Sequence, residues 1–262
     1  MDFIEVNGTA LRYDLSGSGA STLVLIHEMG GTLESWDLVL PMLSAKRRIL
    51  RYDTRGAGLS QKLRGALAID TMVDDLVALM DALDITGKVA LAGTAVGGAI
   101  ALQAAVRVPE RVAAVVVSSP AIGIAPDRRP AVLARVERME RDGLRAVLDT
   151  LDSAYPPELR GDAQRFAAFR ARWLGSDPAS FAAIYRMLAG TDLQAELPRI
   201  ACPALVIAGA LDRTRPPALV EPVARAIPGA RYVVLETGHY AAVQTPELYA
   251  QTIGEFLDAA GA

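Results

Sequence analysis

The chain is poor in cysteine and in long apolar runs, and each shortage excludes a class of protein. Its 262 residues include one cysteine, Cys202, which excludes an internal disulfide and a cysteine-rich metal site. The longest apolar runs, such as Val112–Val117, are too short to cross a bilayer, and the first residues show no basic-then-apolar signal pattern. The sequence therefore predicts a cytoplasmic protein without a membrane span.

A strong excess of charge of one sign is also lacking. The formal net charge is -3 at pH 7, and the basic residues, nearly all arginine, are interleaved with acids. A protein that binds nucleic acid or an anionic membrane usually shows a basic patch or stripe instead. We therefore expect a small-molecule substrate as the partner, and neither nucleic acid nor a membrane.

Hydrophobic residues make up 52% of the chain, enough for the core of one α/β domain. Short β-rich runs alternate with longer helical patterns, which is typical of a largely parallel sheet covered by helices on both faces. The turn signal Asn7-Gly8 makes the first two strands antiparallel. The eight predicted strands are Ile4–Val6, Leu11–Leu15, Leu23–Ile26, Arg48–Tyr52, Val89–Ala92, Val112–Val117, Ala204–Ala208 and Tyr232–Leu235, and the helical patterns are Asp70–Leu83, Gly97–Arg107, Ala218–Ile227 and Glu247–Leu257.

The interval 120–198 interrupts this rhythm, because it holds several helical stretches and no convincing strand. Insertions at the edge of such a sheet are where a lid over a site is carried. We therefore predict a helical cap over residues 120–198, and a core formed by residues 1–119 and 199–262. A cap face rich in alanine and leucine would suit a homodimer.

The segment Gly93-Thr94-Ala95-Val96-Gly97 has the form of a nucleophile elbow without the nucleophile. In the pattern Gly-x-Ser-x-Gly, a strand turns sharply into a helix and exposes the central side chain at the top of the sheet. Here the central residue is Ala95, whose methyl group can neither attack a carbonyl nor share a proton with a base. Thr94 carries a hydroxyl next door, but adjacent side chains diverge at such a turn, so we reject it as a substitute.

An acid and a histidine follow two later strands, at the edge of the sheet where the elbow also lies. Asp212 comes after the run Ala204–Ala208, and His239 comes after Tyr232–Leu235. The chain order of nucleophile position, acid and base is the order of an α/β-hydrolase. His239 would take a proton from a hydroxyl at position 95, and Asp212 would orient the imidazole and stabilise its charged form. Ser118 and Ser119 also follow a strand, but neither is a carboxylate, so the acid role falls to Asp212.

The other histidine begins the segment His27-Glu28-Met29-Gly30-Gly31, after the third predicted strand. This segment matches the loop that supplies half of an oxyanion hole, whose donors would be the backbone N–H groups of Met29 and Val96. We expect His27 to hold the loop by hydrogen bonds. Glu28 is unusual there: we expect it to turn outward to solvent or to an arginine, with an extra acid or base as the alternative.

The chain resembles the α/β-hydrolases along its whole length, and within them the 3-oxoadipate enol-lactonase group. The resemblance is carried by Arg48–Ser60, by Ala204–Asp212 and by Gly238-His239. It implies hydrolysis of an ester, a lactone or a related acyl bond through a serine acyl-enzyme, without metal or organic cofactor. It also implies that Asp53, Arg55 and Ser60 form a supporting loop beside the oxyanion segment.

Substrate contacts are less defined by the sequence. Trp36 and Tyr240 lie next to the oxyanion loop and the base, so they are candidates for lining the cleft, with core packing as the alternative. A carboxylated lactone would require an arginine. The cap region offers five candidates, namely Arg128, Arg129, Arg135, Arg138 and Arg186.

Three accounts of Ala95 remain open from the sequence. In the first account, Ala95 replaces a natural serine. The chain is then a form that traps substrate, because loss of such a nucleophile costs on the order of a millionfold in kcat. Alternatively, Ala95 is native, and His239, with or without Glu28, activates water or transfers a proton. In the third account the protein is a ligand-binding relative that gave up catalysis. Retention of Asp212, His239 and both elbow glycines argues against the third.

Overall fold

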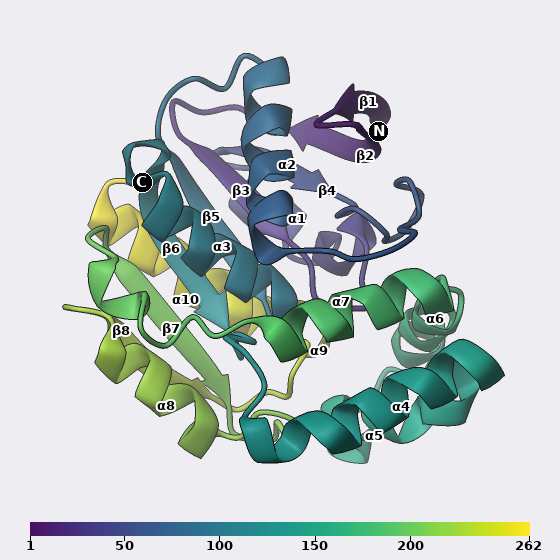
Figure 1. Ribbon diagram of the computed structural model, residues 1–262. Coiled ribbons are helices and arrows are strands. Elements are labelled where there is room, and N and C mark those ends of the chain that lie inside the picture. Colours follow the sequence, from purple (N-terminus) through teal and green to yellow (C-terminus); the bar gives the residue numbers. More distant parts are fainter.

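The computed structural model describes residues 1–262 and has a single sheet of eight strands in the order β1-β2-β4-β3-β5-β6-β7-β8 (Figure 1). The first strands, β1 and β2, are antiparallel to their neighbours, and all later neighbours are parallel. The predicted eight-stranded, mostly parallel sheet is therefore confirmed. The strands are β1 (Asp2–Val6), β2 (Thr9–Ser16), β3 (Thr22–Ile26), β4 (Arg48–Tyr52), β5 (Val89–Thr94), β6 (Val112–Ser118), β7 (Ala204–Gly209) and β8 (Arg231–Leu235).

The turn between β1 and β2 is the one that the sequence signals. Asn7 and Gly8 both have positive φ, 47° and 68°, and Val6 pairs directly with Thr9. Positive φ at both central residues matches the right-handed twist of the flanking strands, which is why asparagine and glycine are favoured there. The antiparallel start of the sheet thus follows from two residues.

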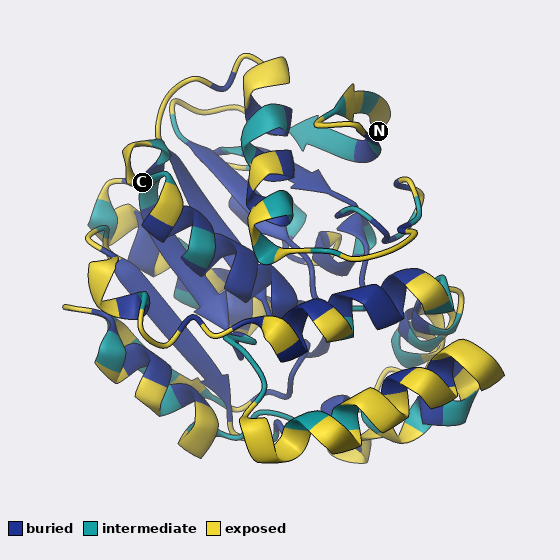
Figure 2. Ribbon diagram, in the orientation of Figure 1, coloured by how far each residue is buried: buried dark blue, intermediate teal, exposed yellow.

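Alternate residues of the central strands face two separate cores. Val24 and Ile26 of β3 join a cluster with α2, α3 and α8, whereas Leu23 and Leu25 join a cluster with α1, α9 and α10. Because side chains alternate along a strand, strands that are apolar at every position require helices on both faces. The helices of these layers are α1 (Leu40–Leu43), α2 (Ile69–Ala82), α3 (Val96–Arg107), α8 (Pro217–Ala226), α9 (Ala241–Gln244) and α10 (Pro246–Ala260). Figure 2 shows the buried strands between these layers.

The segment predicted as a cap adds no strand to the sheet and is mostly helical, with one isolated β-bridge between Gly123 and Asp192. Between β6 and β7 lie α4 (Arg129–Asp142), α5 (Leu148–Ala154), α6 (Ala163–Leu174) and α7 (Pro178–Gly190), gathered at the lower right of Figure 1. Short 3₁₀ helices lie beside them at Pro126–Arg128, Leu144–Val147, Pro157–Leu159 and Leu197–Arg199, and two more at Leu33–Trp36 (η1) and Pro109–Arg111. No helix of the chain is both long and apolar enough to span a membrane.

Aromatic side chains join these helices to the sheet domain. Phe169 and Trp173 of α6 and Phe181 of α7 form a third apolar cluster with Tyr240, which follows His239 in the chain. At Gly30, with φ of 77°, an added Cβ would lie 2.5 Å from Cδ1 of Trp173. The helical segment therefore packs directly on the predicted oxyanion loop, where only glycine leaves enough room.

Candidate active site

The elbow is formed although the nucleophile is absent. Ala95 lies between β5 and α3 with φ of 52° and ψ of -111°. Its N–H donates to Ser118 O at 3.0 Å, and its carbonyl accepts from Ala121 N at 2.9 Å. Such a conformation costs an L-residue on the order of 1–3 kcal/mol and persists only when the surroundings hold it. The strained turn of a nucleophile elbow is thus present around a methyl group.

Both elbow glycines are required by close backbone approach. An added Cβ at Gly93 would lie 2.2 Å from Gly97 O, and one at Gly97 would lie 2.1 Å from Ile26 O. No side chain fits at such distances, so α3 can start this close to β3 and β5 only with glycine at both positions. This is the role that the motif predicts for them.

Asp212 and His239 lie together although they are 27 positions apart in the chain. Nδ1 of His239 is 2.7 Å from Oδ2 of Asp212, and both side chains are buried. Asp212 also accepts hydrogen bonds from the Ser119 hydroxyl and from the backbone N–H groups of Thr214 and Arg215. Nε2 of His239 has no partner in the protein, so one ring nitrogen is oriented and the other is free.

The surroundings of Asp212 favour its ionised form. Burial by itself raises the pKa of this carboxyl, but the charge and hydrogen bond of His239, the Arg215 N–H and the Ser119 hydroxyl outweigh burial and lower the pKa to about 2. A carboxylate that stays ionised can fix the imidazole tautomer and stabilise an imidazolium.

This lowered pKa predicts a loss of stability in acid. The folded-state pKa of Asp212 lies below its usual value of 3.8, so its stabilisation is complete above that value and is lost as the pH falls through about 2. The difference corresponds to about 2 kcal/mol in the free energy of unfolding. Denaturant titrations between about pH 5 and pH 2 should show this loss in the parent chain and not in Asp212→Asn. The exposed Asp127→Asn serves as the control, and an equal acid loss in Asp212→Asn would contradict the assignment.

His27 holds the predicted oxyanion loop and has no free ring nitrogen. Its Nε2 accepts from the backbone N–H of Thr54 at 3.0 Å, so Nδ1 carries the proton and donates to Glu28 O at 2.7 Å. The imidazole is 1% exposed. These contacts match the structural role expected for His27.

One predicted oxyanion donor belongs to the elbow and the other to the loop after the neighbouring strand β3. Val96 is the first residue of α3, and Met29 follows Glu28 in the loop after β3. Neither backbone N–H donates a hydrogen bond to a carbonyl in a loop or turn, or to a side chain. The positive end of α3 adds to the field at Val96. This pair of donors is suited to a developing negative charge on a carbonyl oxygen.

Glu28 does not turn outward, so the expectation of a solvent or arginine partner is wrong. It is 3% exposed, and the only hydrogen-bond partner of its carboxyl is the Ser35 hydroxyl, 2.8 Å from Oε1. No arginine, lysine or histidine forms a salt bridge with it. An added Cβ at Gly31 would lie 2.4 Å from Oε1, so the carboxyl folds back over its own loop. A buried carboxyl with one neutral partner is costly, which is typical of functional positions.

Ser35, the hydrogen-bond partner of Glu28, lies beside a cavity of about 300 Å³ between η1 and α6, which Arg165, Arg172 and Val243 also line. Ser35 itself is 2% exposed, and its hydroxyl also accepts from the backbone N–H of Thr32 at 3.4 Å.

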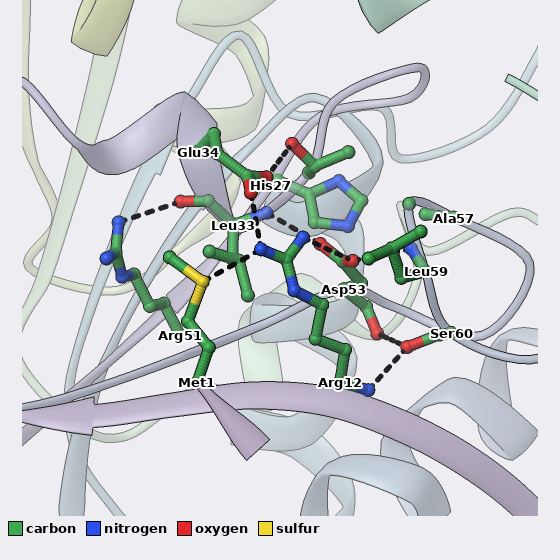
Figure 3. Close-up of polar contacts among 12 residues, drawn as sticks. Met1, Arg12, His27, Leu33, Glu34, Arg51, Asp53, Ala57, Leu59 and Ser60 are labelled. Atoms are coloured by element: carbon green, nitrogen blue, oxygen red, sulfur yellow. Dashed lines mark hydrogen bonds and ion pairs between the residues drawn. The ribbon is translucent and has the colours of Figure 1, made fainter. Parts of the chain in front are cut away.

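An ion network of Arg12, Glu34 and Asp53 holds η1, which follows the predicted oxyanion loop in the chain (Figure 3). Oδ1 of Asp53 accepts from Leu33 N at 2.8 Å, and Oδ2 accepts from Leu59 N at 2.8 Å and from Arg12 at 3.3 Å. The Ser60 hydroxyl donates to the Asp53 carbonyl. These contacts match the supporting role that the resemblance implies for Asp53 and Ser60. Arg55 pairs instead with Asp75, on α2.

Removing the charge of Asp53 should destabilise the protein strongly. In Asp53→Asn, Arg12 has one acidic partner fewer. The side-chain NH₂ group of the asparagine also faces N–H groups, which are donors themselves and cannot accept its hydrogen bonds. Breaking a buried pair in this way costs about 3 kcal/mol or more in the free energy of unfolding, measured by urea titration. Asp74→Asn breaks a surface pair with Arg107 and should cost less than about 1 kcal/mol. Equal losses in the two variants would contradict this account.

The remaining predicted residues divide between site and core. Tyr240 packs against Phe169, with ring centroids 4.6 Å apart, and against His239. Trp36 is fully buried beside Tyr249, which is the core-packing alternative and not a cleft wall. The Thr94 hydroxyl contacts Ser118 at 2.9 Å inside the sheet, as expected for a side chain that diverges from Ala95.

Comparison with known proteins decides the family. Residues 17–238 match the α/β-hydrolase family model described as serine aminopeptidase, S33. The chain belongs to this α/β-hydrolase family. The hydrolase is 28% identical over 251 residues to 3-oxoadipate enol-lactonase 2 of Acinetobacter baylyi, covering 95% of this chain and 93% of the relative. The crystal structure of the enol-lactonase from Burkholderia xenovorans has a TM-score of 0.91 and 30% identity, covering 98% of this chain and 100% of that one.

Another relative is more similar in sequence, but over a shorter part of the chain. The hydrolase is 42% identical over 110 residues to the dihydrolipoyllysine-residue acetyltransferase component of the acetoin cleaving system of Pseudomonas putida, which is 42% of this chain and 30% of that protein. The full-length matches confirm the predicted resemblance and identify an α/β-hydrolase of the esterase and enol-lactonase type.

Three contacts of the hydrolase site were not predicted from the sequence. Ser119 and the backbone of Arg215 complete the shell around Asp212, and Ser35 holds Glu28. Ser119 follows a strand at the active edge of the sheet, which is a weak positional hint. The other two depend on how distant loops pack, and nothing in the local pattern indicates them.

Proposed function

We propose that this site is built to hydrolyse a small ester, lactone or related acyl bond through a nucleophile at position 95, and that Ala95 leaves a substrate-trapping form. The observation that carries the proposal is the strained backbone of Ala95. A methyl group gains nothing from this conformation, whereas a hydroxyl there would be presented above the sheet. The family name and the enol-lactonase relatives point to the same chemistry.

The geometry supports a complete reaction cycle once a hydroxyl stands at position 95. His239 Nε2 would take the hydroxyl proton as the oxygen attacks the carbonyl carbon of the substrate, and the carbonyl electrons would move to an oxyanion at Met29 and Val96. His239 would then pass its proton to the leaving oxygen as the ester bond breaks. Water, deprotonated in turn by His239, would then attack the acyl carbon. The bond between that carbon and the oxygen of residue 95 would break, and the oxygen would take the proton back from His239, which releases the acid and restores the hydroxyl. Asp212 remains ionised throughout.

Intact-protein mass spectrometry tests for the covalent intermediate. Ala95→Ser, quenched soon after mixing with p-nitrophenyl acetate, should gain the mass of one acetyl group. The parent chain should gain none. Loss of His239 in the Ala95→Ser background should prevent the gain, because the hydroxyl is then not activated. An acetyl group on the parent chain, or none on any form, would contradict the proposal.

Burial of Glu28 favours a second candidate function. In it Ala95 is the native residue, and His239, assisted by Glu28, takes a proton from water or from the substrate itself. The observation is the carboxyl that is 3% exposed, lies next to the oxyanion donor Met29 and has no cation to neutralise it. This route predicts activity in the parent chain that Glu28→Gln abolishes.

A further inference from the structure

Two residues at the carboxyl edge of the sheet have a backbone conformation that their residue types do not favour. Among the residues other than glycine with positive φ, Asn7 and Asp84 are of types that tolerate it, because their short polar side chains can hydrogen-bond locally. The other two are Ala95, at the centre of the elbow, and Ser119, with φ of 45°. Glycine at position 119 would avoid this strain, so we expect the serine side chain to make a contact that glycine cannot make.

The hydroxyl of Ser119 contacts the acid of the predicted site. It donates to Oδ2 of Asp212 at 2.7 Å, and the same oxygen lies 2.7 Å from Nδ1 of His239. Ser119 is 1% exposed, and its backbone N–H donates to Ile207 O of β7 at 2.9 Å. The backbone of Ser119 is therefore fixed to the sheet, and its side chain is fixed to the carboxylate that holds the base.

The hydrogen bonds of Asp212 divide between its two oxygens. Oδ1 accepts from the N–H groups of Thr214 and Arg215, which belong to the same loop as Asp212. Oδ2 faces Ser119 and His239. Without the Ser119 hydroxyl, Oδ2 would have His239 as its only partner, so no contact from the end of β6 would fix the direction of the carboxylate.

The segment that carries Ser119 also holds the elbow. Ser118 O accepts from the N–H of Ala95 at 3.0 Å, and the N–H of Ala121 donates to Ala95 O at 2.9 Å. Ser119 lies between these two contacts in the chain. The segment 118–121 therefore contacts position 95 through its backbone and Asp212 through the Ser119 side chain, so one short segment links the nucleophile position to the acid and its base.

The other titratable groups that face Asp212 and His239 come from several loops and from the cap. They are the guanidinium of Arg215, the phenol of Tyr240, whose ring packs edge-on against the imidazole, and Glu28 and Tyr185, which face Tyr240. From α5, the carbonyl of Ala154 accepts from the backbone N–H of His239 at 3.3 Å. A substitution at position 119 changes the charge of none of these groups. It removes one hydrogen bond to Asp212, and with it the positive end of a dipole near His239.

We propose that Ser119 is a positioning residue, whose hydroxyl fixes the direction of the Asp212 carboxylate and limits how strongly that carboxylate attracts the proton of His239. Its part in catalysis rests on the proposed function, whereas its effect on His239 rests on the contacts around Asp212. A donated hydrogen bond partly neutralises the carboxylate, so the imidazolium beside it is stabilised less. A base that must both take and return a proton works best when neither step is strongly favoured.

NMR titration of the imidazoles tests this role in the chain as it stands, without requiring turnover. The chain has two histidines, and His239→Gln identifies the signal of each. The His239 signal should titrate at least about 0.5 pH unit higher in Ser119→Ala than in the parent chain, because the carboxylate then attracts the imidazolium more strongly. Ser119→Gly should give the same displacement while it relieves the positive φ, so it separates the hydroxyl from the backbone strain.

The matched control is Ser118→Ala, which removes the neighbouring buried hydroxyl. Ser118 is 2% exposed, and its hydroxyl contacts Thr94 and Tyr249 and not Asp212. This variant should keep the His239 titration within about 0.2 pH unit of the parent chain, and thermal melts should show that all variants are folded. An unchanged titration in both Ser119 variants, a displacement to lower pH, or an equal displacement in Ser118→Ala would overturn the proposal.

In the Ala95→Ser background, Ser119→Ala should change kcat and KM differently. It should lower kcat for p-nitrophenyl acetate by roughly tenfold and leave KM within about twofold, because the hydroxyl acts on the acid and base and not on the substrate. If Ala95→Ser hydrolyses the ester but neither Ser119 variant moves the titration, the hydrolase proposal holds and the positioning role is wrong. If the titration moves in the parent chain but Ala95→Ser hydrolyses nothing, Ser119 positions the pair and the acyl chemistry is wrong.

Discussion

Ala95→Ser should raise kcat for small esters and lactones by roughly 10⁵-fold over the parent chain. The physical reason is that the turn at Ala95 is already strained and Asp212 already holds His239, so a single hydroxyl would complete the proposed site. Serine adds one oxygen to a side chain that is 7% exposed and keeps the same backbone strain. Initial rates with p-nitrophenyl acetate and with a small lactone would measure the gain.

The matched control for this gain is Ala95→Gly. It relieves the positive φ of position 95 without supplying a hydroxyl, so it separates chemistry from backbone relaxation. Its rate should stay at the level of the parent chain. A serine variant no faster than the glycine variant would remove the proposed hydrolase mechanism, and substrate binding without turnover in either would favour a ligand-binding protein.

His239→Ala should lower kcat by roughly 10⁴- to 10⁶-fold in the Ala95→Ser background. His239 is the only histidine held by a carboxylate with one ring nitrogen free, since His27 has both ring nitrogens engaged by Glu28 O and Thr54 N. Steady-state kinetics at saturating ester would measure the loss. Thermal melts must be compared first, because the buried Asp212 loses its hydrogen-bond partner in this variant.

Glu28→Gln in the same background distinguishes the two candidate functions. For a serine mechanism the rate should remain within about tenfold, since the introduced amide can still accept from Ser35 and no step passes through the Glu28 carboxyl. For the serine-independent route, the parent chain itself should be active, and both Glu28→Gln and His239→Ala should abolish that activity. A large loss for Glu28→Gln in the serine background would mean that Glu28 takes part in the serine reaction.

The sheet was predictable from local patterns. Runs such as Val112–Val117 are apolar at every position, which identifies a strand buried on both faces. The helix predicted over Asp70–Leu83 is observed at Ile69–Ala82, because its apolar spacing matches one face of a helix. The four-residue helices α1 and α9 were not predicted, since so short a segment carries no periodic signal.

The candidate site was predictable only in part. Asp212 and His239 stand just past strands in an order that one fold requires, so the residue order by itself predicts that they meet. Glu28 was placed on the wrong side of its loop. Its burial depends on the hydrogen bond from Ser35, seven residues away, and on the missing side chain of Gly31, three residues away. No sequence pattern predicts either contact.

Sequence alone determined that alanine stands at the centre of the glycine pattern of an elbow, and it predicted an acid, a base and an oxyanion loop, because glycine spacing and residue order can be read directly from the chain. Tertiary structure decided what surrounds that alanine: the strain retained at Ala95, the closed shell of Asp212 and the buried Glu28. These depend on distances between segments far apart in the chain. Hydrogen bonds and burial depend on which groups are close in three dimensions. They are therefore fixed only when the loops at the sheet edge pack together.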